Sequence, residues 1–226
     1  MNPSTFIDPS CGFCVEINDL DADNNLLKSI ITPQTGLESR YVYENDEFIV
    51  MPTLGAFVEG YVMIVPKTHY DCIGKMPLES IDALAKLSET IKKQVKEAYG
   101  TSVICFEHGS VSCANKFGGC LNHAHLHILP CNVSLIEEIS EYDLEISLLP
   151  NLSVLHDYGS VDNPYLFFED ISGEQYVITG EYIVSQFFRK LVANHIGLSE
   201  AWDWRENLFL ENVLNTVRRL KQDDSQ

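Results

Sequence analysis

The segment from residue 123 to residue 130 reads His123-Ala124-His125-Leu126-His127-Ile128-Leu129-Pro130. Side chains two residues apart point to the same face of a strand, whereas on a helix they do not face one another. A strand here therefore predicts three imidazoles on one face and the apolar side chains of residues 124, 126 and 128 on the other. A half-buried strand with outward histidines would alternate in the same way, but three histidines in register favour a chemical site.

The composition is that of a globular protein with an acidic surface. The chain has 226 residues, of which 45% are hydrophobic, and a formal net charge of −18. Such a chain can bury a sizeable core, and its charge opposes binding to nucleic acids or anionic membranes. No run of about 18 apolar residues and no signal peptide are recognisable. We therefore expect a cytoplasmic protein without a membrane or a stable nucleic-acid partner.

The cysteines point to thiols or a metal site. There are seven, at positions 11, 14, 72, 105, 113, 120 and 131, and an odd number in a chain of this size argues against a disulfide framework. Cys11 and Cys14 have the C-x-x-C spacing that lets two thiolates reach one tetrahedral metal ion. A redox pair with this spacing would start a helix that follows a strand, whereas this pair precedes every predicted strand.

The hydrophobic pattern predicts an α+β fold. Apolar residues at helical spacing predict a long helix from 77 to 99 that ends at Gly100. Strands are predicted at 40–43, 47–52, 61–66, 103–106, 123–130, 165–169 and 175–179. Further helices are predicted at 133–142, at 181–196 and within 199–220, and a turn at 107–109. We expect an antiparallel sheet with the long helix on it, in a domain of residues 1–150, and a C-terminal extension of residues 151–226, a strand hairpin and helices, packed on the same domain.

The histidine strand suggests phosphorus chemistry. A near-neutral imidazole can attack phosphorus through one nitrogen when a hydrogen bond fixes the tautomer at the other, and a strand provides nearby carbonyl groups for that bond. His125, in the middle, is the natural nucleophile. A flanking imidazole on the same face can donate to phosphate oxygens as negative charge builds up.

This pattern resembles the histidine triad superfamily, whose signature His-x-His-x-His-x-x, with apolar x, is matched by residues 123–129. Residues 65–69, Val-Pro-Lys-Thr-His, and 106–109, Phe-Glu-His-Gly, are also similar to family segments, so the resemblance covers residues 11–130. It implies a HIT-like fold and transfer of a nucleotide α-phosphate to the middle histidine. The release of the nucleotide to water or to another acceptor stays open. The chain looks similar to the dinucleoside polyphosphate hydrolases and, more distantly, to galactose-1-phosphate uridylyltransferase; nucleoside phosphoramidates are also candidate substrates.

The resemblance also implies roles for individual residues. His125 corresponds to the covalent nucleophile, and His127 to the group that contacts phosphate oxygens. The residue that assists the leaving group falls on Cys120, with Asn122 as a possible substitute. The acidic residue that binds the ribose hydroxyls in this fold falls on Thr53.

Zinc is implied by the same resemblance. Zinc-containing members complete the C-x-x-C half-site with the histidine after the Pro-Lys turn and the first histidine of the triad. The predicted ligands are therefore Cys11, Cys14, His69 and His123. A closed Cys2His2 site leaves no position for a substrate, so we expect a structural zinc ion.

The remaining candidates concern an anionic substrate. Lys67 and Arg189 could hold it, and His108 could face it, although a solvent-exposed helix or turn position is the alternative for Arg189 and His108. The alternative to an enzyme is a non-catalytic, zinc-dependent nucleotide-binding or interaction protein that retains the triad. A homodimer is a possible assembly, since superfamily members with one triad domain are commonly dimeric.

Overall fold

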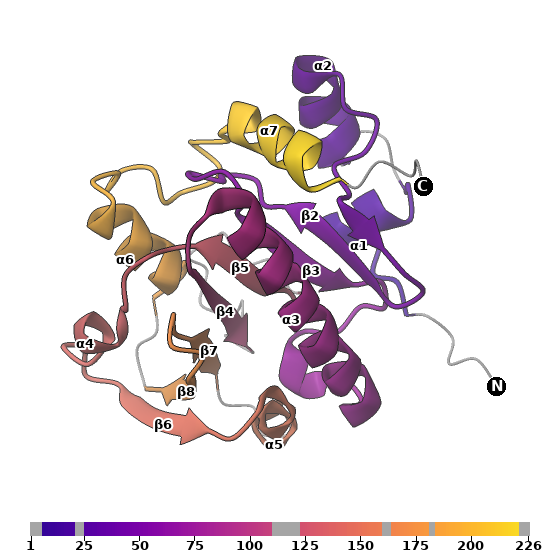
Figure 1. Ribbon diagram of the computed structural model, residues 1–226. Helices are drawn as coiled ribbons and strands as arrows, with labels where there is room; N and C mark the ends of the chain where they lie inside the picture. Colours follow the sequence, from indigo (N-terminus) through magenta and orange to yellow (C-terminus); the bar gives the residue numbers. More distant parts are fainter. Residues whose placement is uncertain (1–5, 21–24, 110–122, 160–163, 181–183, 222–226) are drawn as a thin grey trace.

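The computed structural model describes residues 6–20, 25–109, 123–159, 164–180 and 184–221. Its centre is an eight-stranded antiparallel sheet in the order β1-β2-β3-β5-β4-β7-β8-β6 (Figure 1). The strands are β1 (Tyr43–Glu44), β2 (Phe48–Pro52), β3 (Val62–Pro66), β4 (Val103–Gly109), β5 (Leu126–Pro130), β6 (Glu145–Leu149), β7 (Tyr165–Glu169) and β8 (Gln175–Thr179).

The helices lie on both faces of this sheet and around its ends. They are α1 (Gly12–Ile17), the π-helix η1 (Leu27–Ile31), α2 (Thr32–Thr35), the 3-10 helix η2 (Ile73–Lys75), α3 (Leu78–Tyr99), α4 (Ile136–Ile139), the 3-10 helix η3 (Leu152–Val154), α5 (Leu155–Gly159), α6 (Phe187–His195) and α7 (Leu210–Leu220). The predicted α+β class, with a long helix on an antiparallel sheet, is confirmed. Among the described residues, no helix has both the length and the apolar character needed to cross a membrane.

The long helix α3 covers one face of the sheet (Figure 1). Its buried residues Ile81, Leu84, Ile91 and Val95 lie at helical spacing and join one core cluster with side chains of β2, β3, β4 and β5. Gly100 ends the helix in the left-handed conformation, with φ of +63°, which costs glycine little. The prediction of a helix that stops at this glycine is confirmed.

The opposite face is covered from two sides. Near β2 and β3, Phe13 of α1 packs against Met51, Met63 and neighbouring residues. Near β4 and β5, α6 contributes Phe188 and others to a second cluster that includes Phe106. The triad lies between these two clusters.

The triad strand alternates as predicted. Ala124, Leu126 and Ile128 all belong to the core cluster under α3, whereas His125 and His127 line a pocket on the other face. The regular strand is shorter than predicted, however, because β5 starts at Leu126 and only residues 126–128 pair with β3.

Some predicted elements are wrong in extent or type. Residues 107–109 continue β4 instead of forming a turn, because they pair with residues 165–167 of β7. Of the strand predicted at 40–43, only Tyr43 belongs to β1. Within the described residues, the helices predicted at 133–142 and 181–196 extend only over α4 and α6. Strand β6 was not predicted; pairing with β8 stabilises it.

The C-terminal extension is tied to the loop between β2 and β3. The side chain of Asn212 donates to the carbonyl oxygen of Ala56 at 2.7 Å. The hydroxyl of Thr216 accepts the N–H of Gly60 at 2.9 Å. Since β7 also pairs with β4, residues 164–180 and α7 are attached to the same sheet as the triad.

Glu107 is a fully buried carboxyl group beneath η2. Its Oε1 accepts the N–H of Ile73 at 2.6 Å, and its Oε2 accepts the O–H of Tyr165 at 2.7 Å. Burial raises the pKa of Glu107 from 4.5 to about 7, although both hydrogen bonds act to lower it. The folded protein therefore keeps a proton between pH 4.5 and 7 that the unfolded chain releases.

This difference predicts a loss of stability with rising pH. The contribution of Glu107 is fully present below about pH 4.5 and is lost as the pH rises through about 7, because the unfolded chain binds fewer protons in this interval. Glu107→Gln keeps the shape without the charge and is expected to gain stability relative to the wild type between pH 5 and 8. Chemical unfolding at several pH values tests this, with the exposed Glu145→Gln as control. If the free energy of unfolding depended on pH in the same way for the wild type and for Glu107→Gln, this prediction would be wrong.

Candidate active site and metal centre

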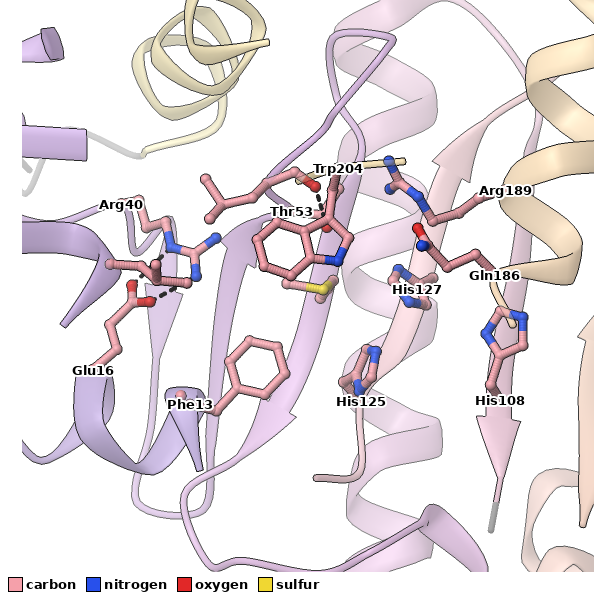
Figure 2. Close-up of a pocket in the computed structure, with 14 residues that line it drawn as sticks. Phe13, Glu16, Arg40, Thr53, His108, His125, His127, Gln186, Arg189 and Trp204 are labelled. Carbon is pink, nitrogen blue, oxygen red and sulfur yellow. Dashed lines mark hydrogen bonds and ion pairs between the residues drawn. The ribbon is translucent and has the colours of Figure 1, made fainter. Parts of the chain in front are cut away.

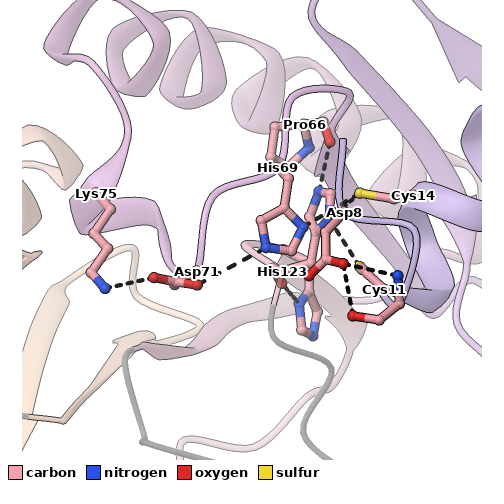
Figure 3. A network of polar contacts seen from close by, with 10 residues as sticks. Asp8, Cys11, Cys14, Pro66, His69, Asp71, Lys75 and His123 are labelled. Carbon is pink, nitrogen blue, oxygen red and sulfur yellow. Dashed lines mark hydrogen bonds and ion pairs between the residues drawn. The ribbon is translucent and has the colours of Figure 1, made fainter. Parts of the chain in front are cut away.

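Two thiols and two imidazoles meet where the N-terminal segment reaches the sheet (Figure 3). Cys11 precedes α1 and Cys14 lies within it, His69 follows β3, and His123 precedes β5. All four side chains are buried, and one ligand atom from each lies within 4.8 Å of every other. The structure therefore brings together the four residues predicted as metal ligands.

The geometry of this cluster identifies the nitrogen atoms that face its centre. His123 Nδ1 lies 3.4 Å from Cys11 Sγ and 3.6 Å from Cys14 Sγ, and His69 Nδ1 lies 3.4 Å from Cys14 Sγ. The other nitrogen of His123, Nε2, donates to the carbonyl oxygen of Pro66 at 2.8 Å. This bond leaves Nδ1 of His123 as the unprotonated nitrogen that points to the thiols.

His125 is held by the backbone of the residue two positions before it. Its Nδ1 lies 2.7 Å from the carbonyl oxygen of His123, which can only accept, so Nδ1 carries the proton. Burial lowers the pKa of His125, while this hydrogen bond acts to raise it. The neutral ring therefore has an unprotonated Nε2 with a free electron pair.

His127 is oriented by Tyr61 and Phe106. Its Nδ1 lies 3.1 Å from the Tyr61 hydroxyl. When the phenol donates this hydrogen bond, Nδ1 of His127 accepts it and Nε2 carries the hydrogen. Stacking on Phe106, with ring centroids 4.5 Å apart, further fixes the imidazole.

Three neutral imidazoles line the pocket (Figure 2). Burial lowers the pKa of His127 well below 6.5, and the charges of His125, His108 and Arg189 lower it further. Burial also lowers the pKa of His108, to about 3, helped by His125 and Arg189. These rings can act as hydrogen-bond partners or as nucleophiles at neutral pH without a positive charge of their own.

Arg189 gives the pocket its positive charge. It is only 3% exposed and donates to the carbonyl oxygens of Gly55 at 2.7 Å and Trp202 at 2.9 Å. No carboxylate pairs with it among the described residues, whereas Arg40, which also lines the pocket, is neutralised by Glu16 through two bonds of 2.7 Å. A local positive field therefore exists within a protein of net negative charge.

Residues 34–132 match the family model of the HIT domain. This segment is a HIT domain. The match includes His69 and the complete triad, whereas the C-x-x-C pair and the extension with Arg189 lie outside it.

Proteins similar to this chain come from several organisms. An uncharacterised HIT-like protein of Methanocaldococcus jannaschii is 28% identical over 98 residues, which cover 42% of this chain and 70% of the relative. Among solved structures, a HIT-like protein involved in cell-cycle regulation from Bartonella henselae is 21% identical, with a TM-score of 0.41 over 55% of this chain and 81% of that one. A Zn-bound histidine triad family protein from Mycobacterium smegmatis is 20% identical, with a TM-score of 0.39 over 54% and 74%.

The structure unites most of the predicted substrate-site residues. Besides His125 and His127, the pocket is lined by Thr53, His108 and Arg189. Arg189 is buried and His108 is partly buried, so neither occupies the solvent-exposed position that was their alternative.

Three predicted residues are not part of this group. Lys67 is not among the residues that line the pocket, and its ammonium group pairs with Glu44 at 2.7 Å. Cys120 and Asn122 lie outside the described residues. Thr53 does line the pocket. In place of the expected acid it presents a hydroxyl, which donates to the carbonyl oxygen of Leu54 at 3.0 Å.

The sequence did not reveal several residues of the site. Tyr61 precedes β3 on the same face as Met63, which pairs with His127, so only the β3–β5 register brings it to the triad. Gln186 and Trp204 come from the extension and line the pocket without belonging to any motif.

Proposed function

We propose that this protein is a nucleotide hydrolase or nucleotidyltransferase that acts at the α-phosphate through a covalent nucleotidyl-His125 intermediate. The observation that carries the proposal is the 2.7 Å hydrogen bond from His125 Nδ1 to the His123 carbonyl oxygen. It holds the ring with Nε2 unprotonated and directed away from its own backbone, as a nucleophile requires.

The reaction has two steps. Nε2 of His125 forms a bond to the α-phosphorus, and the bond from phosphorus to the leaving group breaks, with its electron pair going to the leaving group, which takes a proton from solvent. Water or another acceptor then attacks phosphorus and gives up a proton to solvent, and the phosphorus–nitrogen bond breaks with its electron pair returning to Nε2, which restores the neutral ring. Throughout, the Nε2–H of His127 is placed by Tyr61 to donate to a phosphate oxygen, and the charge of Arg189 favours the anion.

The Cys2His2 cluster fits a structural zinc ion. Zinc–sulfur bonds of about 2.3 Å and zinc–nitrogen bonds of about 2.0–2.1 Å give a tetrahedral sulfur–nitrogen edge of about 3.5 Å. The observed distances are 3.4, 3.4 and 3.6 Å. Cys11, Cys14, His69 and His123 would hold the ion, which would link α1 to the start of β5 and stabilise the thiolate forms.

A direct test is detection of the intermediate. The protein is mixed with dinucleoside polyphosphates, nucleoside phosphoramidates and nucleotide sugars. The reaction is quenched in alkaline denaturant, because a phosphorus–nitrogen bond is acid-labile, and the mass of the protein and its peptides is measured by mass spectrometry. We expect the mass of one nucleotidyl group on the peptide that contains His125. Tight nucleotide binding without turnover or adduct for any of these compounds would instead support the non-catalytic alternative, which the replacement of the ribose-binding acid by Thr53 favours.

Tyr61→Phe tests the orientation of His127. Without the phenol, His127 is free to change tautomer, so we expect kcat to fall about tenfold, less than for loss of a direct oxyanion donor, while KM stays nearly constant. Tyr43→Phe, an exposed change on β1, is the control. Equal kcat values for wild type and Tyr61→Phe would show that the 3.1 Å contact does not contribute.

A further inference from the structure

Gln186 is held in an unusual backbone conformation at the pocket. It directly precedes α6 with φ of +58° and ψ of 31°, in the left-handed region that residues other than glycine adopt at a cost. Its side chain is only 5% exposed and lines the pocket. A strained residue of this kind beside a reactive group suggests a functional reason for its position.

The polar atoms of Gln186 are unpaired in the described part of the chain. Neither Oε1 nor Nε2 has a partner in hydrogen-bonding geometry, although the amide lies near enough to Asp203 to contribute to the lowered pKa of that carboxyl, after the larger effect of Arg205. Nε2 of His108 is likewise buried and unpaired. Buried polar atoms normally have partners, so these atoms point to a ligand that supplies them.

These groups occupy one side of the pocket. Figure 2 shows Gln186 and His108 on the same side as His127 and Arg189, toward the C-terminal extension. The opposite side contains the ring of Phe13. His125 lies between the two sides, so a ligand bonded to His125 at phosphorus can extend along Gln186.

The side chains of Gln186 and His108 favour an uncharged ligand group. A carboxamide presents one acceptor and two donors side by side, which matches the donor–acceptor edge of a nucleobase in a bidentate contact. The low pKa keeps His108 neutral, and it adds one further hydrogen-bonding atom. Trp204, which also lines the pocket, offers an aromatic side chain on which a base can stack.

We propose that Gln186 is a specificity-determining residue that binds the edge of the substrate's nucleobase, with His108 and Trp204 beside it. This inference rests on the proposed nucleotide function. It assigns base recognition to the C-terminal extension, outside the residues that match the HIT domain.

The test compares ligands with and without a base. Binding of the four common nucleoside 5′-monophosphates and of ribose 5-phosphate is measured by calorimetry for wild type, Gln186→Ala and the exposed control Gln34→Ala. For the tightest nucleotide, we expect Gln186→Ala to bind about tenfold more weakly, near the lower end for a bidentate base contact. Binding of ribose 5-phosphate should stay unchanged, as should all affinities of Gln34→Ala.

Each other outcome overturns the inference in a recognisable way. If Gln186→Ala weakens both ligands equally or neither, Gln186 does not bind the base although the proposed function stands. If the wild type binds neither nucleotide nor ribose 5-phosphate, the proposed function fails as well. Should Gln186→Ala not fold, Gln186→Glu has nearly the same size and replaces the amide donor by a second acceptor, and an unchanged order of preference among the four nucleotides would reject the inference.

Discussion

Replacing His125 by Ala is expected to lower turnover by a factor on the order of 10⁴ or more, the scale of losing a covalent nucleophile. The substitution removes the atom that bonds to phosphorus, and no neighbouring group can take its place in the same geometry. The Nδ1 of His127 faces the Tyr61 hydroxyl at 3.1 Å, and His123 points its free nitrogen at the thiols. The measurement is the steady-state rate with the best substrate of the screen.

The control for this variant is a histidine of the same protein without a role in the pocket. His195, exposed at the end of α6, is suitable, and His195→Ala should retain the wild-type rate. Circular dichroism and metal content should be the same for both variants and the wild type. Turnover by His125→Ala at the wild-type rate would remove this residue from the mechanism.

Joint replacement of Cys11 and Cys14 by Ser is expected to abolish zinc binding and to cost several kcal/mol of stability. Half of the ligand set disappears, and the binding free energy of a structural zinc site contributes directly to folding. The loss should be largest at the N-terminal segment, because α1 contacts the sheet through the small cluster around Phe13. Elemental analysis gives the metal content, and chemical unfolding of the purified variants gives the stability.

Cys131→Ser is the matched control for the double variant. Cys131 is buried to nearly the same degree as Cys11, 8% against 7% exposed, but it lies outside the cluster and donates to the carbonyl oxygen of Val133. This variant should keep one zinc ion per chain. Stoichiometric zinc in the Cys11→Ser and Cys14→Ser double variant would refute the ligand set.

The sequence predicted the parts of the site that depend on short-range periodicity. Alternation at residues 123–128 correctly separated the imidazoles from the apolar residues that pack under α3, because a strand alternates regardless of its partners. The sequence predicted helix α3 and its end at Gly100 equally well. The four cluster residues followed from spacing combined with a family resemblance.

The remainder depended on contacts between distant segments. Glu16 lies in α1 and pairs with Arg40 in the pocket lining, an arrangement that no local pattern encodes. The local pattern predicts a turn at residues 107–109, but pairing with β7 extends the strand. It also predicts a regular helix through Gln186, whereas the helix begins only after the left-handed backbone of this residue.

The two sides of the pocket are encoded far apart in the chain, with Phe13 on one side and Gln186 on the other. A ribosome makes Phe13 and the triad before it makes the second side. During synthesis, His125 is therefore present before the surface that completes its pocket. The order of translation thus separates the appearance of the reactive ring from the assembly of its full binding pocket.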